Sequence, residues 1–241
     1  MLALARQAEA SRIGCFHLVL PGRASVLGGA PQPTLAAAEA AALAEPLLAR
    51  DWVPLRHAFA RHPNAAALWR LDGRSLTVEG GLALAGTLLA VLRTRRPDAA
   101  AGLARAAGLL ARADLGALPR RGIAAAPQAE QQEAADRFFG ITVAETEPAL
   151  SPDLFADQPA PRRLEAMPGL EAWSTASAPL PWRVVVLAGP GLGGSDHPAQ
   201  LGWWLRWLVA ECVLSEALGL ATPQAATGLQ PDLVLTLAAE G

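Results

Sequence analysis

The clearest pattern that could carry chemistry is a glycine loop between an apolar strand and a helix. The strand is Arg183–Leu187, a run of β-branched residues, and the loop is Gly189–Gly194. Backbone N–H groups and the dipole at the start of such a helix can bind an anion. The loop spacing differs from the dinucleotide-binding pattern Gly-x-Gly-x-x-Gly, and Pro190 has no N–H to donate. The loop therefore predicts either a structural turn or a phosphate or nucleotide site. The residues that would form this site are Gly191, Gly193, Gly194 and Ser195.

The start of the following helix carries an acid and a base side by side. Asp196 and His197 precede Pro198, and Ser25 follows an apolar strand near the N-terminus. This arrangement resembles the SGNH, or GDSL-like, hydrolases. The resemblance implies an esterase in which Asp196 and His197 activate Ser25 as the nucleophile. The chain departs from the family pattern because it lacks the Gly-Asp-Ser triplet, its Asp and His are adjacent, and its one asparagine, Asn64, is not in a Gly-x-Asn-Asp context.

The helix after the glycine loop is rich in tryptophan. Trp203, Trp204 and Trp207 fall within five residues, and apolar positions continue the pattern to about Leu218. At about 100° per residue these positions point all round the helix, which is typical of a helix buried in its own domain or covered by a partner. Trp and Arg are enriched at interface hot spots, so the sequence predicts that at least one of these tryptophans, with Arg206, contacts a partner or lies in an exposed apolar patch.

Residue types exclude several kinds of chemistry. All 20 basic residues are Arg, so no lysine is present for a Schiff base or a P-loop. The histidines have no Cys or Glu neighbours at metal-ligand spacing, and we expect neither a metal site nor a cofactor. Cys15 and Cys212 lie far apart among apolar residues, which favours two buried thiols over a disulfide. The four histidines are His17, His57, His62 and His197.

The elements that would position these residues are mostly helices. Strands are expected near residues 15, 184 and 233, and the pattern predicts an α+β fold, possibly α/β, with a small mixed sheet. Because Arg183–Leu187 is apolar on both faces, we expect it to be central in that sheet, with the helix after Asp196 packed against it. Helices are expected over residues 34–50, 54–61, 79–93, 99–113 and 128–139.

A change in composition divides the chain. Prolines recur between residues 141 and 182 with acidic residues between them, which is typical of a loop-rich connection or an extended arm. We therefore expect a helix-rich part over residues 1–140, a Pro-rich connecting segment over residues 141–182, and a strand–loop–helix–strand unit over residues 183–241. The last unit is expected to pack on the first part as one globule.

Charge and hydropathy limit the possible partners. The net charge is −2 without a basic stripe, which disfavours nucleic-acid binding. Charges near the N-terminus interrupt any signal-peptide core, and the longest uncharged apolar run, Gly80–Leu92, is too short to span a membrane. We therefore expect a cytoplasmic protein, and the abundance of Ala, Gly, Pro and Arg is typical of a GC-rich bacterial gene.

The function favoured by these patterns is a non-catalytic accessory or scaffold subunit. It would bind a protein partner or form a homo-oligomer through the tryptophan helix. The basis for this hypothesis is the scarcity of catalytic patterns, a hydrophobic content of 52% and a Pro-rich arm that could wrap a partner. One alternative is an SGNH-like hydrolase using Ser25, Asp196 and His197. A further alternative is nucleotide or phosphate binding at Gly189–Gly194.

Overall fold

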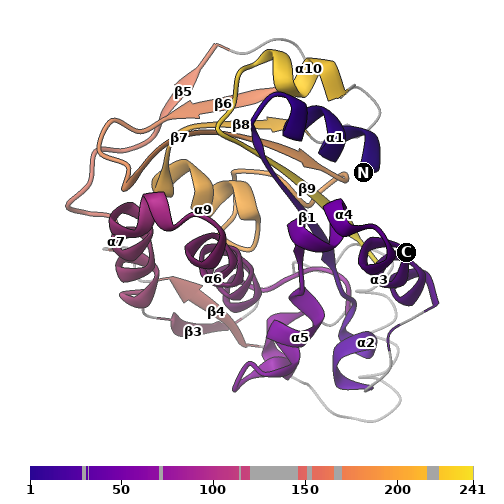
Figure 1. The fold of residues 1–241 in the computed structure, drawn as a ribbon. Coiled ribbons are helices and arrows are strands. Elements are labelled where there is room, and N and C mark those ends of the chain that lie inside the picture. Colours follow the sequence, from indigo (N-terminus) through magenta and orange to yellow (C-terminus); the bar gives the residue numbers. More distant parts are fainter. Residues whose placement is uncertain are drawn as a thin grey trace.

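The computed structural model describes residues 1–28, 31, 33–70, 73–113, 115–119, 146–150, 154–165, 170–215 and 223–240, and within them seven strands form one mixed sheet (Figure 1). The strand order is β2-β1-β9-β7-β8-β6-β5. From β2 to β8 every neighbouring pair is parallel, whereas β6 and β5 add antiparallel pairs at one edge. The bounds are β1 Gly14–Leu20, β2 Trp52–Val53, β5 Arg162–Leu164, β6 Glu171–Ser174, β7 Leu180–Ala188, β8 Val209–Ser215 and β9 Leu233–Ala239. A separate two-stranded sheet pairs β3 (Leu115–Pro119) with β4 (Thr146–Leu150).

Helices cover both faces of the seven-stranded sheet (Figure 1). Side chains of α5, α6, α7 and α9 share the main hydrophobic core with one face, and α1 and α10 pack on the other. Helix outweighs strand, so the predicted class is confirmed, and the parallel strands linked through helices make it the α/β form. The helices are α1 Leu2–Ala10, α2 Arg23–Leu27, α3 Pro33–Ala44, α4 Pro46–Asp51, α5 Leu55–Ala60, α6 Val78–Arg95, α7 Ala100–Ala111, α9 Leu201–Leu208 and α10 Pro223–Gly228, with 3₁₀ turns at Ala65–Leu68 and Pro97–Ala99.

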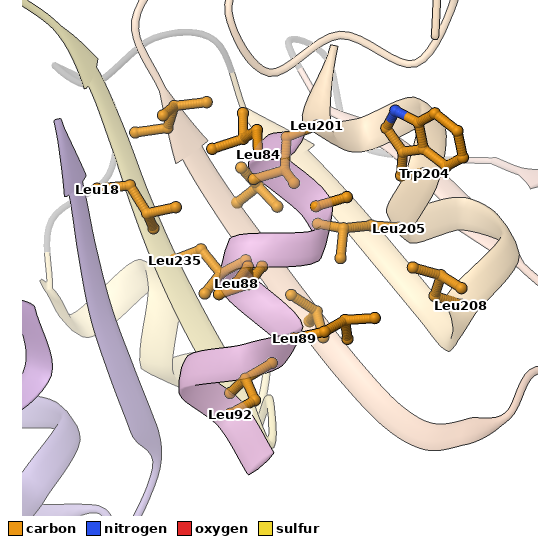
Figure 2. Close-up of a cluster of buried hydrophobic side chains, with 14 of the residues drawn as sticks. Leu18, Leu84, Leu88, Leu89, Leu92, Leu201, Trp204, Leu205, Leu208 and Leu235 are labelled. Carbon is orange, nitrogen blue, oxygen red and sulfur yellow. The ribbon is translucent and has the colours of Figure 1, made fainter. Parts of the chain in front are cut away.

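Strand β7 is the fourth of the seven strands, as its apolar sequence predicts. Val184 and Val186 belong to the core beneath α6 and α9, and Val185 belongs to the cluster beneath α1 and α10. A strand covered on both faces needs apolar side chains at every position, which explains the continuous run. Figure 2 shows the core on the α6 side, where leucines of α6 meet Leu235 of β9 and Leu205 of α9.

Two predicted helices are wrong in their extent. The tryptophan helix ends at Leu208, and Val209–Ser215 forms strand β8 between β7 and β6. The apolar residues of Val209–Ser215 do not follow one side of a helix, because they belong to a strand inside a sheet, which is buried on both faces. The helix expected over residues 34–50 is broken between α3 and α4, where Pro46 cannot continue the preceding helix. The helix expected over residues 128–139 lies outside the described residues.

The three predicted strands are neighbours in the order β1-β9-β7, but the sheet is larger than predicted. Short strands β5 and β6 come from the Pro-rich segment, which the sequence indicates only as a connection. Strand β1, near the N-terminus, pairs along its whole length with β9. The two ends of the described chain therefore contribute adjacent strands, and the division at residues 141–182 stays a prediction.

Candidate functional site

A crevice opens where the parallel strands β1, β9 and β7 end. It is lined by Leu20 at the end of β1, by Leu237 and Ala239 at the end of β9, and by Pro190–Leu192 directly after β7. From β1 the chain continues to β2 on one side, and from β7 it continues to β8 on the other. Ligands of open α/β sheets bind at such a switch point, outside the carboxyl ends of the strands. The cavity measures about 350 Å³, which is in the range of small-molecule sites.

One side of the crevice is lined by Arg70, Arg74, Ser75 and Leu76. The Arg70 N–H donates to the Ser75 carbonyl at 2.8 Å, and the Trp69 indole donates to the Pro21 carbonyl at 3.0 Å. Trp69 and Leu76 also form an isolated β-bridge. These bonds hold Trp69, Arg70 and Ser75 beside the end of β1, where Arg70 and Arg74 line the crevice.

The first turns of α6 close the crevice from the side. Thr77 caps this helix by accepting a hydrogen bond from the Gly80 N–H at 3.2 Å. Two glycines let the helix approach its neighbours, since a Cβ at Gly81 would lie 2.2 Å from the Pro198 carbonyl oxygen. The start of α6 is therefore packed directly on the segment that leads into α9.

The glycine loop Gly189–Gly194 is filled by a side chain of the protein itself. The Gln200 amide donates to the Gly191 carbonyl at 3.5 Å and accepts from the His197 N–H at 3.3 Å. A Cβ at Gly194 would lie only 2.7 Å from this amide. Gly191, with a positive φ of 74°, lies on the crevice lining. The loop is thus a tight turn with the Gln200 amide on its inner side.

The predicted anion-binding residues are not gathered on the crevice. Of the four, Gly191 lines it. A Cβ at Gly193 would meet the Ala188 side chain at 2.4 Å, so this glycine packs on β7. Ser195 is fully buried, donates its hydroxyl to Glu171 at 2.8 Å and accepts from the Trp173 indole at 3.1 Å. Ser195 therefore joins the loop to β6.

The lining of the crevice combines cationic groups with an apolar floor. Arg70 and Arg74 contribute two guanidinium groups. The His197 Nδ1 accepts from the Ala199 N–H at 3.1 Å. The floor consists of leucine side chains. These are Leu20, Leu76, Leu84, Leu192 and Leu237.

The residues of the hydrolase hypothesis have other hydrogen-bond partners. Ser25 is buried on α2 and donates its hydroxyl to Glu240, whose second oxygen accepts from the Gly22 N–H at 2.6 Å. A serine triad needs a histidine whose Nδ1–H donates to a carboxylate and whose Nε2 accepts the serine proton. The Nδ1 of His197 instead accepts from a backbone N–H. Asp196 is exposed at the end of the glycine loop.

The tryptophans of α9 differ in their surroundings. Trp204 is fully buried, and its indole donates to the Pro198 carbonyl at 2.7 Å. Trp203 and Trp207 are half-buried. Phe155, from the Pro-rich segment, stacks on Trp207 with ring centroids 4.3 Å apart.

Arg206 completes this group. Its guanidinium carbon lies 5.1 Å from the Trp173 ring centroid and 5.3 Å from that of Trp203, which is cation–π distance. Burial lowers the pKa of Arg206. We refer to these residues together as the aromatic cluster, and they are largely covered by the chain's own residues. The members of the aromatic cluster are Phe155, Trp173, Trp203, Arg206 and Trp207.

No family model, curated protein or solved structure matches the chain. Across the described ranges, every helix is too short or too polar to cross a lipid bilayer. The same ranges contain no group of three or more His, Cys, Asp or Glu that could hold a metal ion. Cys15 and Cys212 are both buried free thiols, as predicted. Burial raises the pKa of the Cys15 thiol to about 12.

Sequence reasoning did not identify most of the residues that line the crevice. Arg70 and Arg74 lie in the mostly polar stretch Arg70–Ser75, between Trp69 and Leu76, and Asp72-Gly73 within it is a common turn dipeptide. Gln200 lies three residues after His197, in a segment that indicates only the start of a helix. Of the predicted site residues, Gly191 and His197 do line the crevice.

Proposed function

We propose that this protein binds a small organic anion in the crevice at the carboxyl ends of β1, β9 and β7. The observation that carries the proposal is the pairing of Arg70 and Arg74 with a leucine floor at the switch point of the sheet. Guanidinium groups bind carboxylates and phosphates through charge-assisted hydrogen bonds. The sequence predicts, as one alternative, anion binding at the glycine loop. We keep anion binding as the function but propose that the two arginines hold the anion.

Each wall has a separate task in this proposal. Arg70 and Arg74 supply guanidinium groups, the side-chain type that binds carboxylates and phosphates. Leu84 and Leu237 are among the apolar side chains that line the crevice. Such a floor favours the apolar body of a ligand over water, because polar atoms of the ligand would lose hydrogen bonds there.

Ligand-induced stabilisation tests this function. The protein is titrated with inorganic phosphate, AMP, acetate and octanoate by calorimetry, in parallel with thermal unfolding. A ligand at about 100 times its Kd raises the free energy of unfolding by about 2.7 kcal/mol. We expect saturable binding of at least one anion, and we expect Arg74→Gln to weaken it by about 10-fold or more, the loss of one charge-assisted hydrogen bond.

The control is Arg95→Gln, which removes an exposed arginine at the opposite end of α6. It changes the net charge equally without touching the crevice, and it should bind like the unmodified protein. The proposal is wrong if no anion binds, or if the two arginine variants lose affinity to the same extent.

A second candidate is the accessory or scaffold role that the sequence favours for a cytoplasmic protein. The half-buried rings of Trp203 and Trp207 support it, since a partially exposed tryptophan beside an arginine is the composition of interface hot spots. The partner would be a protein or a second copy of this chain. Trp204 contributes to the core in either case, because it is fully buried.

A further inference from the structure

A second cavity lies beside helix α7 and has no described lining residue in common with the crevice. Its volume is about 550 Å³. Three segments line it: the C-terminal half of α7, the turn that joins β6 to β7, and the turn closed by the bond of the Gln158 N–H to the Phe155 carbonyl at 2.9 Å. Helix α7 lies on the outer side of α6 (Figure 1). The polar side chains among the described lining residues are Arg105, Arg112, Gln158 and Ser177.

Close contacts between α7 and the turn before β7 fix one wall of this cavity. A Cβ at Gly102 would lie 2.7 Å from the Pro179 carbonyl oxygen. The Arg105 Nη2 donates to the same oxygen at 3.0 Å, which holds the guanidinium at the edge of the cavity. A guanidinium has five N–H donors, so Arg105 keeps donors for a ligand after this bond has formed.

Arg112 lies two helical turns further along α7. Because seven residues make about two turns, Arg105 and Arg112 face the same side of the helix, about 10 Å apart along its axis. Arg112 is exposed, and no described carboxylate lies within ion-pair distance of either arginine. The cavity therefore has one cationic group toward each end and no counter-ion from the described part of the chain.

The space between the two arginines is uncharged. A Cβ at Gly108 would meet no atom within 4 Å, so no other part of the described chain fills the space above this residue. The half-buried Ala178 also lines the cavity. A hydrocarbon chain can lie across this surface without removing a charged or polar side chain from water.

Two neutral side chains add hydrogen-bond donors. The Gln158 Oε1 is buried and has no donor within hydrogen-bond distance, so Nε2 is the atom of this amide that a ligand in the cavity can reach. Ser177 is exposed and contributes a hydroxyl group. An amide N–H and a hydroxyl both donate to carboxylate oxygens, so the donors of the cavity are those that an organic anion requires.

We infer that this cavity binds an elongated organic dianion, with one carboxylate at Arg105, the other at Arg112 and an uncharged chain across Gly108. Guanidinium groups hold carboxylates through charge-assisted hydrogen bonds. The ligand class is an α,ω-dicarboxylate whose two ends match the separation of about 10 Å between two helical turns. This site is separate from the crevice of the proposed function, and either can be wrong without the other.

The experiment titrates the full chain calorimetrically with suberate, succinate and monomethyl suberate. Suberate is long enough to reach both arginines, succinate is too short, and the monomethyl ester has the length of suberate but one charge. We expect suberate to bind at least about 10-fold more tightly than the other two, the effect of one additional charge-assisted hydrogen bond. Equal affinity for suberate and its monomethyl ester would contradict a dianion site.

Two substitutions place the ligand on α7. Arg112→Gln should weaken suberate binding by about 10-fold or more and should remove the preference for suberate over its monomethyl ester. Arg61→Gln removes an exposed arginine after α5 and is the charge-matched control. Gly108→Leu puts a side chain into the cavity and should block suberate. Gly86→Leu is its control, because a Cβ at Gly86 also meets no atom within 4 Å, on another helix. Thermal unfolding shows which variants are folded.

Suberate binding should be unchanged in Arg74→Gln, since Arg74 lines the crevice and not this cavity. The inference is overturned if suberate does not bind, or if folded Arg112→Gln and Gly108→Leu variants bind it like the unmodified protein. Loss of suberate binding in Arg74→Gln alone would assign the dianion to the crevice, which would support the proposed function and exclude the site on α7.

Discussion

The parallel half of the sheet and its antiparallel edge use their polar residues in opposite ways. In the parallel half, β1, β9 and β7 are mostly apolar, although Arg183 lies within β7, and the open crevice lies beyond the strand ends. At the edge, β6 and β5 carry charged and aromatic residues along the strands themselves, and the aromatic cluster fills the space above them. The sequence draws attention to the tryptophans, but the crevice lies in the other region.

The difference follows from what covers each region. Strand β7 has helices on both faces, so most of its side chains are apolar, and Arg183 pairs with Glu211 of β8. Strand β5 is an edge strand, where Pro161 precedes two arginines, Arg162 and Arg163. Proline and charged residues at an edge prevent pairing with another chain. A ligand site is therefore expected in the first region, and a protein contact in the second would involve side chains rather than strand pairing.

The largest expected effect is a difference in stability between two substitutions on α9, one at the buried Trp204 and one at the half-buried Trp207. Trp204→Ala removes a fully buried ring and a hydrogen bond to Pro198, so it should lower the free energy of unfolding by about 3–5 kcal/mol. Trp207→Ala removes a half-buried ring stacked on Phe155 and should cost roughly 1–2 kcal/mol. Urea unfolding measures both values.

The same variants test association at the edge. If the aromatic cluster contacts a partner or a second copy, Trp207→Ala should reduce the assembled fraction in sizing experiments while the protein stays folded. Equal destabilisation by the two substitutions, with no change in size, would assign the whole cluster to the core and remove the main support for a scaffold role.

A smaller effect is expected from acid acting on the parallel half. His17 of β1 is fully buried, its Nδ1 lies 2.8 Å from the Thr236 hydroxyl of β9, and burial lowers its pKa from 6.5 to about 4. The unfolded chain binds a proton at His17 below pH 6.5, whereas the folded chain does so only below about 4. Stability from this residue is therefore fully present above pH 6.5 and is lost as the pH falls to about 4, by roughly 3 kcal/mol in total.

Urea unfolding between pH 7 and pH 4 checks this dependence. His17→Gln should flatten the profile by up to about 1.4 kcal/mol per pH unit in that window. His57→Gln changes an exposed histidine on α5 and is the matched control. A His17→Gln profile as steep as that of the unmodified protein would mean that other groups account for the acid sensitivity.

The fold could be predicted where one residue pattern has one physical cause. The Val-rich run of β7 predicts a covered strand, and the apolar run after Glu79 predicts the helix that the structure shows as α6. The boundary at Leu208 could not be predicted, because a buried helix and a buried strand are equally apolar. Only the pairing of β8 with β7 and β6 decides between them, and those strands are distant in the sequence.

The site was less predictable than the fold. His197 attracts attention because the chain has only four histidines, and Gly191 because it lies in a glycine-rich loop, and both do line the crevice. Arg70 and Arg74 are two of 20 arginines, and neither spacing nor neighbours distinguishes them. They join the site because the turn before α6 is bound to the end of β1 through Trp69 and Pro21. Such a tertiary contact has no local signature.

The smallest expected effect compares two glycines of α6, one packed against the segment before α9 and one without such a neighbour. A Cβ at Gly86 would meet no atom within 4 Å, so Gly86→Ala should raise the free energy of unfolding by about 0.5–1 kcal/mol through the lower entropy of the unfolded chain. A Cβ at Gly81 would lie 2.2 Å from the Pro198 oxygen, closer than any van der Waals contact. Gly81→Ala should therefore lower stability and move the segment that carries His197 and Gln200. Thermal unfolding gives the two signs, and octanoate titration should show weakened binding for Gly81→Ala alone. Stabilisation by both substitutions would mean that α6 and the loop before α9 are not in close contact, and the crevice would then lack the wall on which its shape depends.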